Sequence, residues 1–152
     1  GIDAGAEGAD ESFINPRGLA TDGACHLFVT EARRTVRQVD LASGRVTTLA
    51  GSRSASSVPA DGRGESARFR YLHGILSDGA GGLWIVDNGY LLRRIDIVTR
   101  EVTTVLGDLE EFGLTLSPLR PVLGGVGGLA FGPPEQLFLT SMSQNVVLRI
   151  RF

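Results

Sequence analysis

Apolar residues occur along this chain in short clusters separated by turn-forming residues. Between residues 69 and 107 there are four such clusters: Gly74–Ser77, Leu83–Asp87, Leu92–Ile97 and Val102–Leu106. The breaks include Asp78-Gly79 and Asn88-Gly89, dipeptides that readily adopt the positive φ angles of tight hairpins. Clusters this short and rich in Val, Ile, Leu and Thr are typical of strands and too short for helices. The pattern therefore predicts four antiparallel strands joined mostly by tight turns.

The same pattern occurs 56 residues earlier, from Phe13 to Gly51. Without a gap, 12 of the 39 aligned positions are identical, and most others exchange like for like. Residues 1–12 repeat the loop that precedes the second copy, and a third, weaker copy begins at Gly128. Self-similarity at a fixed period predicts a repeat architecture.

Hydrophobic side chains belong to both faces of the predicted strands. Leu83–Val86 and Leu27–Val29 are apolar at consecutive positions, whereas a strand with one wet face alternates. Repeated four-stranded sheets that are covered on both faces are typical of β-propeller blades. We therefore predict an all-β fold, with residues 1–152 forming a single partial β-propeller domain. Its blades are expected at about residues 13–51, 69–107 and, incompletely, 128–152.

The repeats amount to about 2.75 four-stranded blades, whereas closed propellers have roughly four to eight. We expect this region to be part of a six-bladed ring, with the other blades supplied by a longer chain or by self-association. Phe28, Trp84 and Phe138 share one repeat position in the second strand, which predicts core packing rather than base stacking.

The repeats resemble the NHL repeat. The second copy carries that family's pattern in three runs, preceded by a glycine-rich loop that ends in Ala-Arg-Phe. These are Ile85–Asp87, Arg93–Asp96 and Val102–Gly107, after Asp61–Phe69. The first copy has Glu31 in place of Asp87, and the third has Ser141 there. The resemblance implies a propeller, but it leaves function open, because NHL-like propellers bind proteins or RNA or act as sensors, and a few relatives are enzymes.

Charge narrows the choice of partner. The formal net charge is −2 and all 15 basic residues are arginine, so there is no general attraction to phosphate backbones. Nucleic acid is therefore an unlikely partner. No run of about 18 apolar residues is present to span a bilayer. The single Cys25 cannot form an internal disulfide.

Strand direction sorts the loops between the two ends of each sheet. Because antiparallel strands reverse direction, the turn between the second and third strands shares an end with the long links between copies. Function in repeat folds concentrates on the loop-rich face, so we expect the binding residues there. The candidates are Arg33, Arg34, Arg53, Arg63, Asn88, Tyr90 and Gln144.

The titratable residues predict neither a catalytic set nor a metal site. His26 and His73 occupy unrelated repeat positions, with no second His or Cys at ligand spacing, so no zinc or other cofactor is expected. Glu31 and Asp87 recur at one blade position and could together hold Ca²⁺ or act as acid and base. Because this position recurs with an arginine six residues later, we favour pairing with that arginine or with turn amides.

Three functions follow. The first is a non-catalytic recognition or scaffold module whose loop-rich face binds a protein, peptide or glycan, with a protein or peptide as the preferred partner. The alternatives are a propeller hydrolase or lyase with an axial metal site, and an RNA-binding domain.

Overall fold

The computed structural model describes residues 12–32, 34–54, 56–107, 116–117, 120–121, 125–132 and 136–151. Almost all regular structure in these residues is strand. The first sheet comprises β1 (Pro16–Thr21), β2 (His26–Glu31), β3 (Thr35–Asp40) and β4 (Val46–Gly51). The second comprises β6 (Leu72–Ser77), β7 (Gly82–Asp87), β8 (Leu91–Asp96) and β9 (Glu101–Leu106), with the short β5 (Gly62–Arg63) added beside β9. The third comprises β12 (Val126–Gly132), β13 (Gln136–Ser141) and β14 (Val146–Arg151).

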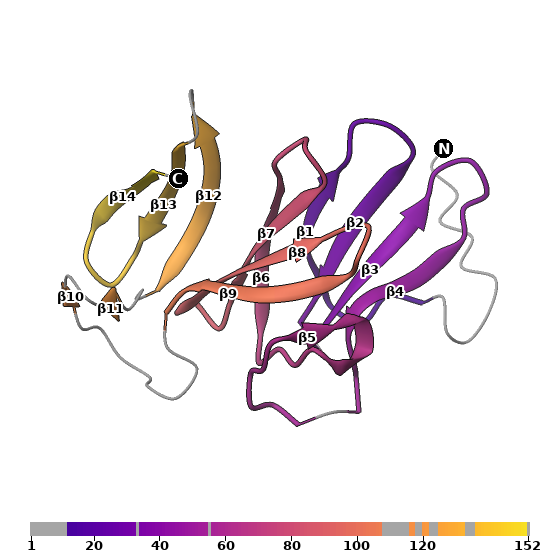
Figure 1. Cartoon of the computed structure of the whole chain (residues 1–152), viewed down its shortest axis with the longest axis horizontal. Coiled ribbons are helices and arrows are strands. Elements are labelled where there is room, and N and C mark those ends of the chain that lie inside the picture. Colours follow the sequence, from indigo (N-terminus) through magenta and orange to yellow (C-terminus); the bar gives the residue numbers. More distant parts are fainter. Residues whose placement is uncertain are drawn as a thin grey trace.

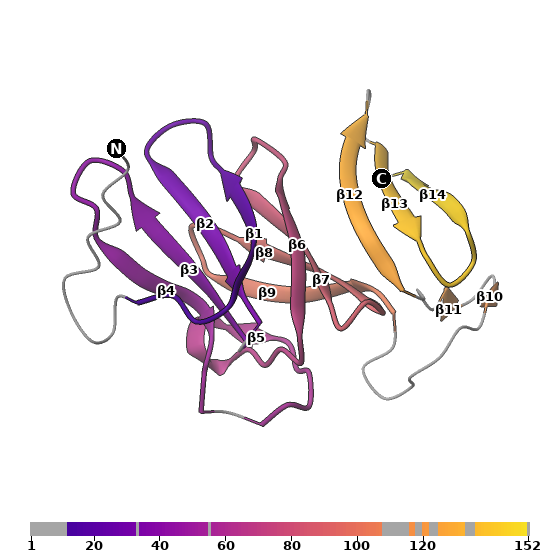
Figure 2. The same ribbon diagram turned by 180° about the vertical axis from the view of Figure 1, so that it is seen from behind.

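Each sheet is an antiparallel meander in chain order, as the repeat predicts. The three sheets fan out side by side in chain order (Figures 1 and 2), and β6 contacts both β1 and β12. The first strands are longer than predicted: β6 begins at Leu72 rather than Gly74. The extra residues include a register shift between Leu72 and Ile75, which breaks the simple alternation of the sequence.

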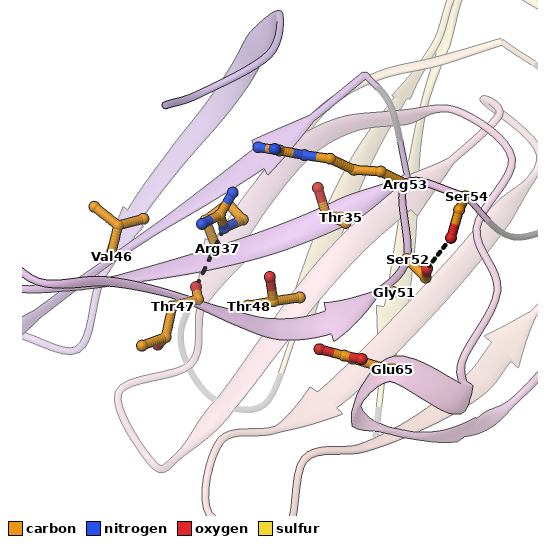
Figure 3. Close-up of a pocket in the computed structure, with 10 residues that line it drawn as sticks. All are labelled: Thr35, Arg37, Val46, Thr47, Thr48, Gly51, Ser52, Arg53, Ser54 and Glu65. Carbon is orange, nitrogen blue, oxygen red and sulfur yellow. Dashed lines mark hydrogen bonds between the residues drawn. The ribbon is translucent and has the colours of Figure 1, made fainter. Parts of the chain in front are cut away.

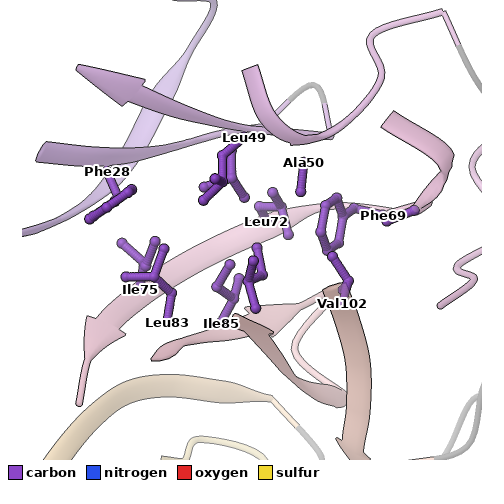
Figure 4. Packing of buried hydrophobic residues seen from close by; sticks show 12 residues of the cluster. Phe28, Leu49, Ala50, Phe69, Leu72, Ile75, Leu83, Ile85 and Val102 are labelled. Atoms are coloured by element: carbon purple, nitrogen blue, oxygen red, sulfur yellow. The ribbon is translucent and has the colours of Figure 1, made fainter. Parts of the chain in front are cut away.

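The middle sheet is covered on both faces. Leu83 and Ile85 pack with Phe28 and Leu49 of the first sheet (Figure 4), whereas Trp84 packs with residues of the third sheet. All six residues of β7 are buried. The consecutive apolar run therefore serves two interfaces, which confirms the argument for stacked blades. The third sheet is covered less completely, and Phe138 is accordingly only half-buried.

Aspartates cap the third turn of both four-stranded sheets. Asp40 Oδ1 accepts hydrogen bonds from the amides of Ala42 and Ser43 at 3.1 and 2.7 Å. Asp96 makes the equivalent bonds to Val98 and Thr99. The amide and hydroxyl of Ser43 hold the pKa of Asp40 below its usual value. Both acids therefore stabilise the turn between the third and fourth strands of their sheet.

The link between the first two blades follows an unexpected path. The link leaves β4 at the loop-rich end, and the whole link was expected to lie at that end. Instead, Gly62 and Arg63 pair with Val102 and Glu101 at the far end of β9. The 3₁₀ turn η1 (Gly64–Ser66) contacts β4, and the chain then returns to the loop-rich end through the fully buried Phe69. The buried Phe69 thus anchors the end of the link, but the middle of the link lies at the opposite end. Two further short strands, β10 (Leu116–Ser117) and β11 (Arg120–Pro121), pair with each other in the second link.

Candidate functional site

The motif residues of the second blade form one buried network around Arg93. This side chain is fully buried, and its guanidinium donates to Asp87 Oδ2 at 3.2 Å and to Asp61 Oδ1 at 2.9 Å. It also donates to the carbonyl oxygens of Ala60 and Arg68, and it lies 5.3 Å from the centroid of the Phe69 ring. Arg93 therefore binds the link between the first two blades to the second sheet.

Asp87 completes this network from the end of β7. Its Oδ1 accepts hydrogen bonds from the amides of Arg70 and Tyr71, each at 2.9 Å. Burial raises the pKa of the Asp87 carboxyl, against the effect of these amides and of Arg93. Burial likewise lowers the pKa of the Arg93 guanidinium. Both carboxylate oxygens of Asp87 therefore accept hydrogen bonds that hold this part of the blade together.

Glu31 has the corresponding place in the first blade but a different main partner. Its Oε1 accepts from the amide of Ile14 at 2.7 Å, which repeats the Asp87–Arg70 bond 56 residues later. Arg53 donates to both carboxylate oxygens, at 2.9 and 3.1 Å, and the Thr35 hydroxyl donates to Oε2. Asp87 pairs with the arginine six residues later and with amides, as predicted. Glu31 also accepts an amide hydrogen bond, but it bonds mainly to Arg53 and lies 3.9 Å from Arg37. Among the described residues, no three His, Cys, Asp or Glu side chains gather in a way that could hold a metal ion.

Arginines converge on Tyr71 at the loop-rich end. A cavity of about 260 Å³ is lined by Ala32, Arg34, Arg53, Arg70 and Tyr71, and we call it the arginine pocket. Arg17 donates to the Tyr71 hydroxyl, and its guanidinium lies 5.4 Å from the centroid of that ring. Three arginines therefore share one cavity with Tyr71, and a fourth, Arg17, contacts the Tyr71 side chain.

His73 lies beside Tyr71, and the burial and the charges of this region shift its pKa. Its ring lies edge-on to Tyr71, with centroids 4.9 Å apart. Burial lowers the pKa of His73, and the positive charge of Arg17 lowers it further, while Asp87 acts in the opposite direction. His73 is therefore neutral and adds no positive charge near neutral pH.

A larger cavity lies on the outer rim of the first blade. It has a volume of about 530 Å³ and opens between β4 and η1 (Figure 3). We call it the rim pocket; it is lined by Thr35, Arg37, Val46, Thr47, Thr48, Gly51, Ser52, Arg53, Ser54 and Glu65. Arg53 lines both pockets and forms a salt bridge with the buried Glu31.

The structure brings only some of the predicted binding residues together. Arg34 and Arg53 share the arginine pocket, and the amide of Asn88 donates to the Tyr71 carbonyl beside it at 2.7 Å. Tyr90 is half-buried in the same turn as Asn88. Gln144 lies in the β13–β14 turn of the third sheet, and Arg33 is outside the described residues.

Arg63 was expected on the loop-rich face, and that placement is wrong. Its Nε donates to the Thr99 carbonyl at 2.8 Å, in a turn at the opposite end of the second sheet. Conversely, the sequence reasoning missed Arg17, Arg70 and Tyr71. Their positions in the sequence could have identified them. They lie just before or at the start of the first strand of a blade, and that strand begins at the loop-rich end.

Comparisons with known proteins agree on the fold alone. No protein family profile matches the chain, and no curated protein matches its sequence. It is similar to auxiliary nutrient binding proteins from Bacteroides thetaiotaomicron (15% identity, TM-score 0.67) and Bacteroides ovatus (15%, 0.62). These matches cover 88% and 90% of this chain but only 36% and 34% of the others. A Thermus thermophilus protein with a provisional assignment as a glucose dehydrogenase gives 19% identity and a TM-score of 0.55, over 92% of this chain and 44% of that one.

The fold is a β-propeller, of which the described residues form two four-stranded blades and three strands of a third. The chain spans 36% and 34% of the length of the two nutrient binding proteins and 44% of the Thermus thermophilus protein. No helix among the described residues has the length and apolar character needed to cross a bilayer.

Proposed function

We propose that this propeller is a non-catalytic recognition module of the NHL type, whose arginine pocket binds an acidic peptide segment of a partner protein. The assignment to the NHL type rests on what the motif residues do. Asp61 and Asp87 both accept hydrogen bonds from the buried Arg93, so the motif residues share one structural role. The function rests on the arginine pocket itself.

The observation that carries the proposal is the local concentration of positive charge in an acidic chain. The formal net charge is −2, yet Arg34, Arg53 and Arg70 line one cavity with Tyr71. Buried Glu31 offsets part of this charge through Arg53. Guanidinium groups bind carboxylates with two parallel hydrogen bonds, and an adjacent aromatic ring gives a peptide a surface to pack against. An acidic side chain beside an apolar one is the ligand that fits.

The test is fluorescence anisotropy with a labelled Gly-Ser peptide that carries four interspersed Asp and Glu residues. The same peptide with Asn and Gln is the control ligand. Arg34→Gln and Arg70→Gln should each weaken binding of the acidic peptide roughly threefold to tenfold, because one charged hydrogen-bonding group is lost. Raising the salt concentration should weaken binding as well.

Arg45→Gln is the matched control variant, since it removes the same charge from an exposed position in a turn at the opposite end. It should leave the affinity unchanged. Equal binding of the acidic and amide peptides, or equal losses in all three variants, would contradict the proposal. In that event the peptide would be responding to overall charge or to a different face.

A further inference from the structure

The rim pocket of the first blade is the counterpart of a place that is filled in the second blade. There, the Asp61 carboxylate accepts from Arg93 at 2.9 Å and from the amide and hydroxyl of Thr104 at 3.0 and 2.8 Å. One carboxylate is thus held by a guanidinium, a backbone N–H and a hydroxyl. The second blade shows which chemical group this part of the repeat accommodates.

The first blade carries the same donors in the same register. Arg37 pairs with Thr48 across β3 and β4, as Arg93 pairs with Thr104 across β8 and β9. Both sheets have a register shift immediately before the arginine, so the local backbone geometry is repeated. Arg37 and Thr48 both line the rim pocket, and Arg37 is only 3% exposed.

The acid is what differs between the two copies. The residue 56 positions before Asp61 is Gly5, which has no side chain to supply a carboxylate. We propose that the rim pocket binds the carboxylate of a small-molecule ligand through Arg37 and Thr48, in the manner of Asp61. This site is separate from the arginine pocket and does not depend on the function proposed for it.

Two carboxylates oppose binding, because the buried Glu31 lies 3.9 Å from the Arg37 guanidinium and Glu65 lines the cavity. Glu65 faces the cavity from η1 (Figure 3) and repels a second negative charge. Arg53 lines the same cavity, but its guanidinium is already bonded to Glu31. The balance of charge favours a ligand with a single carboxylate over a dicarboxylate or a phosphate monoester.

The test follows the amide resonance of Thr48 while sodium acetate is added to the full chain at constant ionic strength. The Thr48 amide should shift saturably, since Thr104 uses its amide in this way. Thr48→Val and Arg37→Gln should each weaken acetate binding about tenfold, the loss expected when a hydrogen bond to a charged group is removed. Glu65→Gln should strengthen it, and this exposed substitution leaves the fold intact.

Two results would overturn the proposal. One is an amide resonance of residue 48 that does not saturate, or that responds equally in the wild type and in Thr48→Val. The other is an acetate response centred on Arg34 and Arg70, which would place carboxylate binding in the arginine pocket alone. Loss of peptide binding in Arg34→Gln with an unchanged Thr48 response would separate the two sites.

Discussion

Glu31 and Asp87 occupy one position in adjacent repeats, yet they are neutralised by different arginines. Asp87 bonds directly to Arg93 on the neighbouring strand at 3.2 Å. The corresponding distance from Glu31 to Arg37 is 3.9 Å, and Glu31 instead bonds to Arg53 at 2.9 Å. Arg53 belongs to the link that follows the sheet rather than to the sheet itself.

Glutamate is one methylene group longer than aspartate, and this extra length changes which arginine the carboxylate pairs with. The glutamate carboxylate reaches past the strand to the link, which leaves Arg37 beside the rim pocket rather than in a close salt bridge with the blade's acid. In the second blade, Arg93 is enclosed by Asp87, Asp61 and two carbonyl oxygens. The arginine of the second blade is therefore enclosed by the link, whereas Arg37 of the first blade donates to the Thr47 carbonyl at 3.4 Å and also lines the rim pocket.

The largest effect is expected from Arg93→Met. The substitution leaves the fully buried Asp87 without its cation and releases the link, so the free energy of unfolding should fall by about 3 to 5 kcal/mol. Arg37→Met should cost only about 1 kcal/mol, because its ion pair with Glu31 is long. Urea denaturation followed by tryptophan fluorescence measures both losses. Equal losses would show that the two arginines have equivalent structural roles.

A smaller effect is expected from Glu31→Asp, which gives the first blade the acid of the second. The shortened side chain should lose its contact with Arg53, at a cost of about 1 to 2 kcal/mol in the free energy of unfolding. Arg53→Gln in the same background should then add little further loss. A full additional loss in the double variant would mean that the Glu31–Arg53 pair does not account for the effect.

The smallest effect concerns acid stability. The Asp22 pKa is lowered to about 2: burial opposes the shift, but hydrogen bonds from the Ala24 amide and from His26 outweigh it. Because the folded pKa lies below the unfolded one, this carboxylate stabilises the fold above about pH 4, and the contribution is lost as the pH falls towards 2. Asp22→Asn should flatten the fall in melting temperature between these pH values, as differential scanning calorimetry would measure. An unchanged slope would assign the acid sensitivity to other groups, such as Asp78.

The secondary structure was predictable because its causes are local. Alternation, turn dipeptides and the 56-residue offset located the strands of the first two blades to within about two residues. Gly51 and Gly107 end equivalent strands with φ of 83° and 96°, a conformation that the repeated glycine anticipates. The turn roles of Asp40 and Asp96 also depend only on residues within three positions.

The candidate site was predictable only in part. Arg34 and Arg53 were assigned to the loop-rich end by strand direction, and both line the arginine pocket. Arg70 and Tyr71 were missed because their exposure depends on how the link returns to β6. Arg63 was misplaced because β5 pairs with β9, a contact between residues about 40 positions apart that no local pattern encodes.

The sequence by itself therefore determined the repeat, its strands and the two-faced hydrophobicity that requires blades to stack. Only the tertiary structure decided which arginines meet. Local propensities set the conformation of each blade, whereas the path of the link and the packing between sheets bring Arg34, Arg53 and Arg70 to one cavity with Tyr71. The path of the link and the arrangement of the sheets depend on packing between residues far apart in the chain. Many side chains contribute to that packing at once.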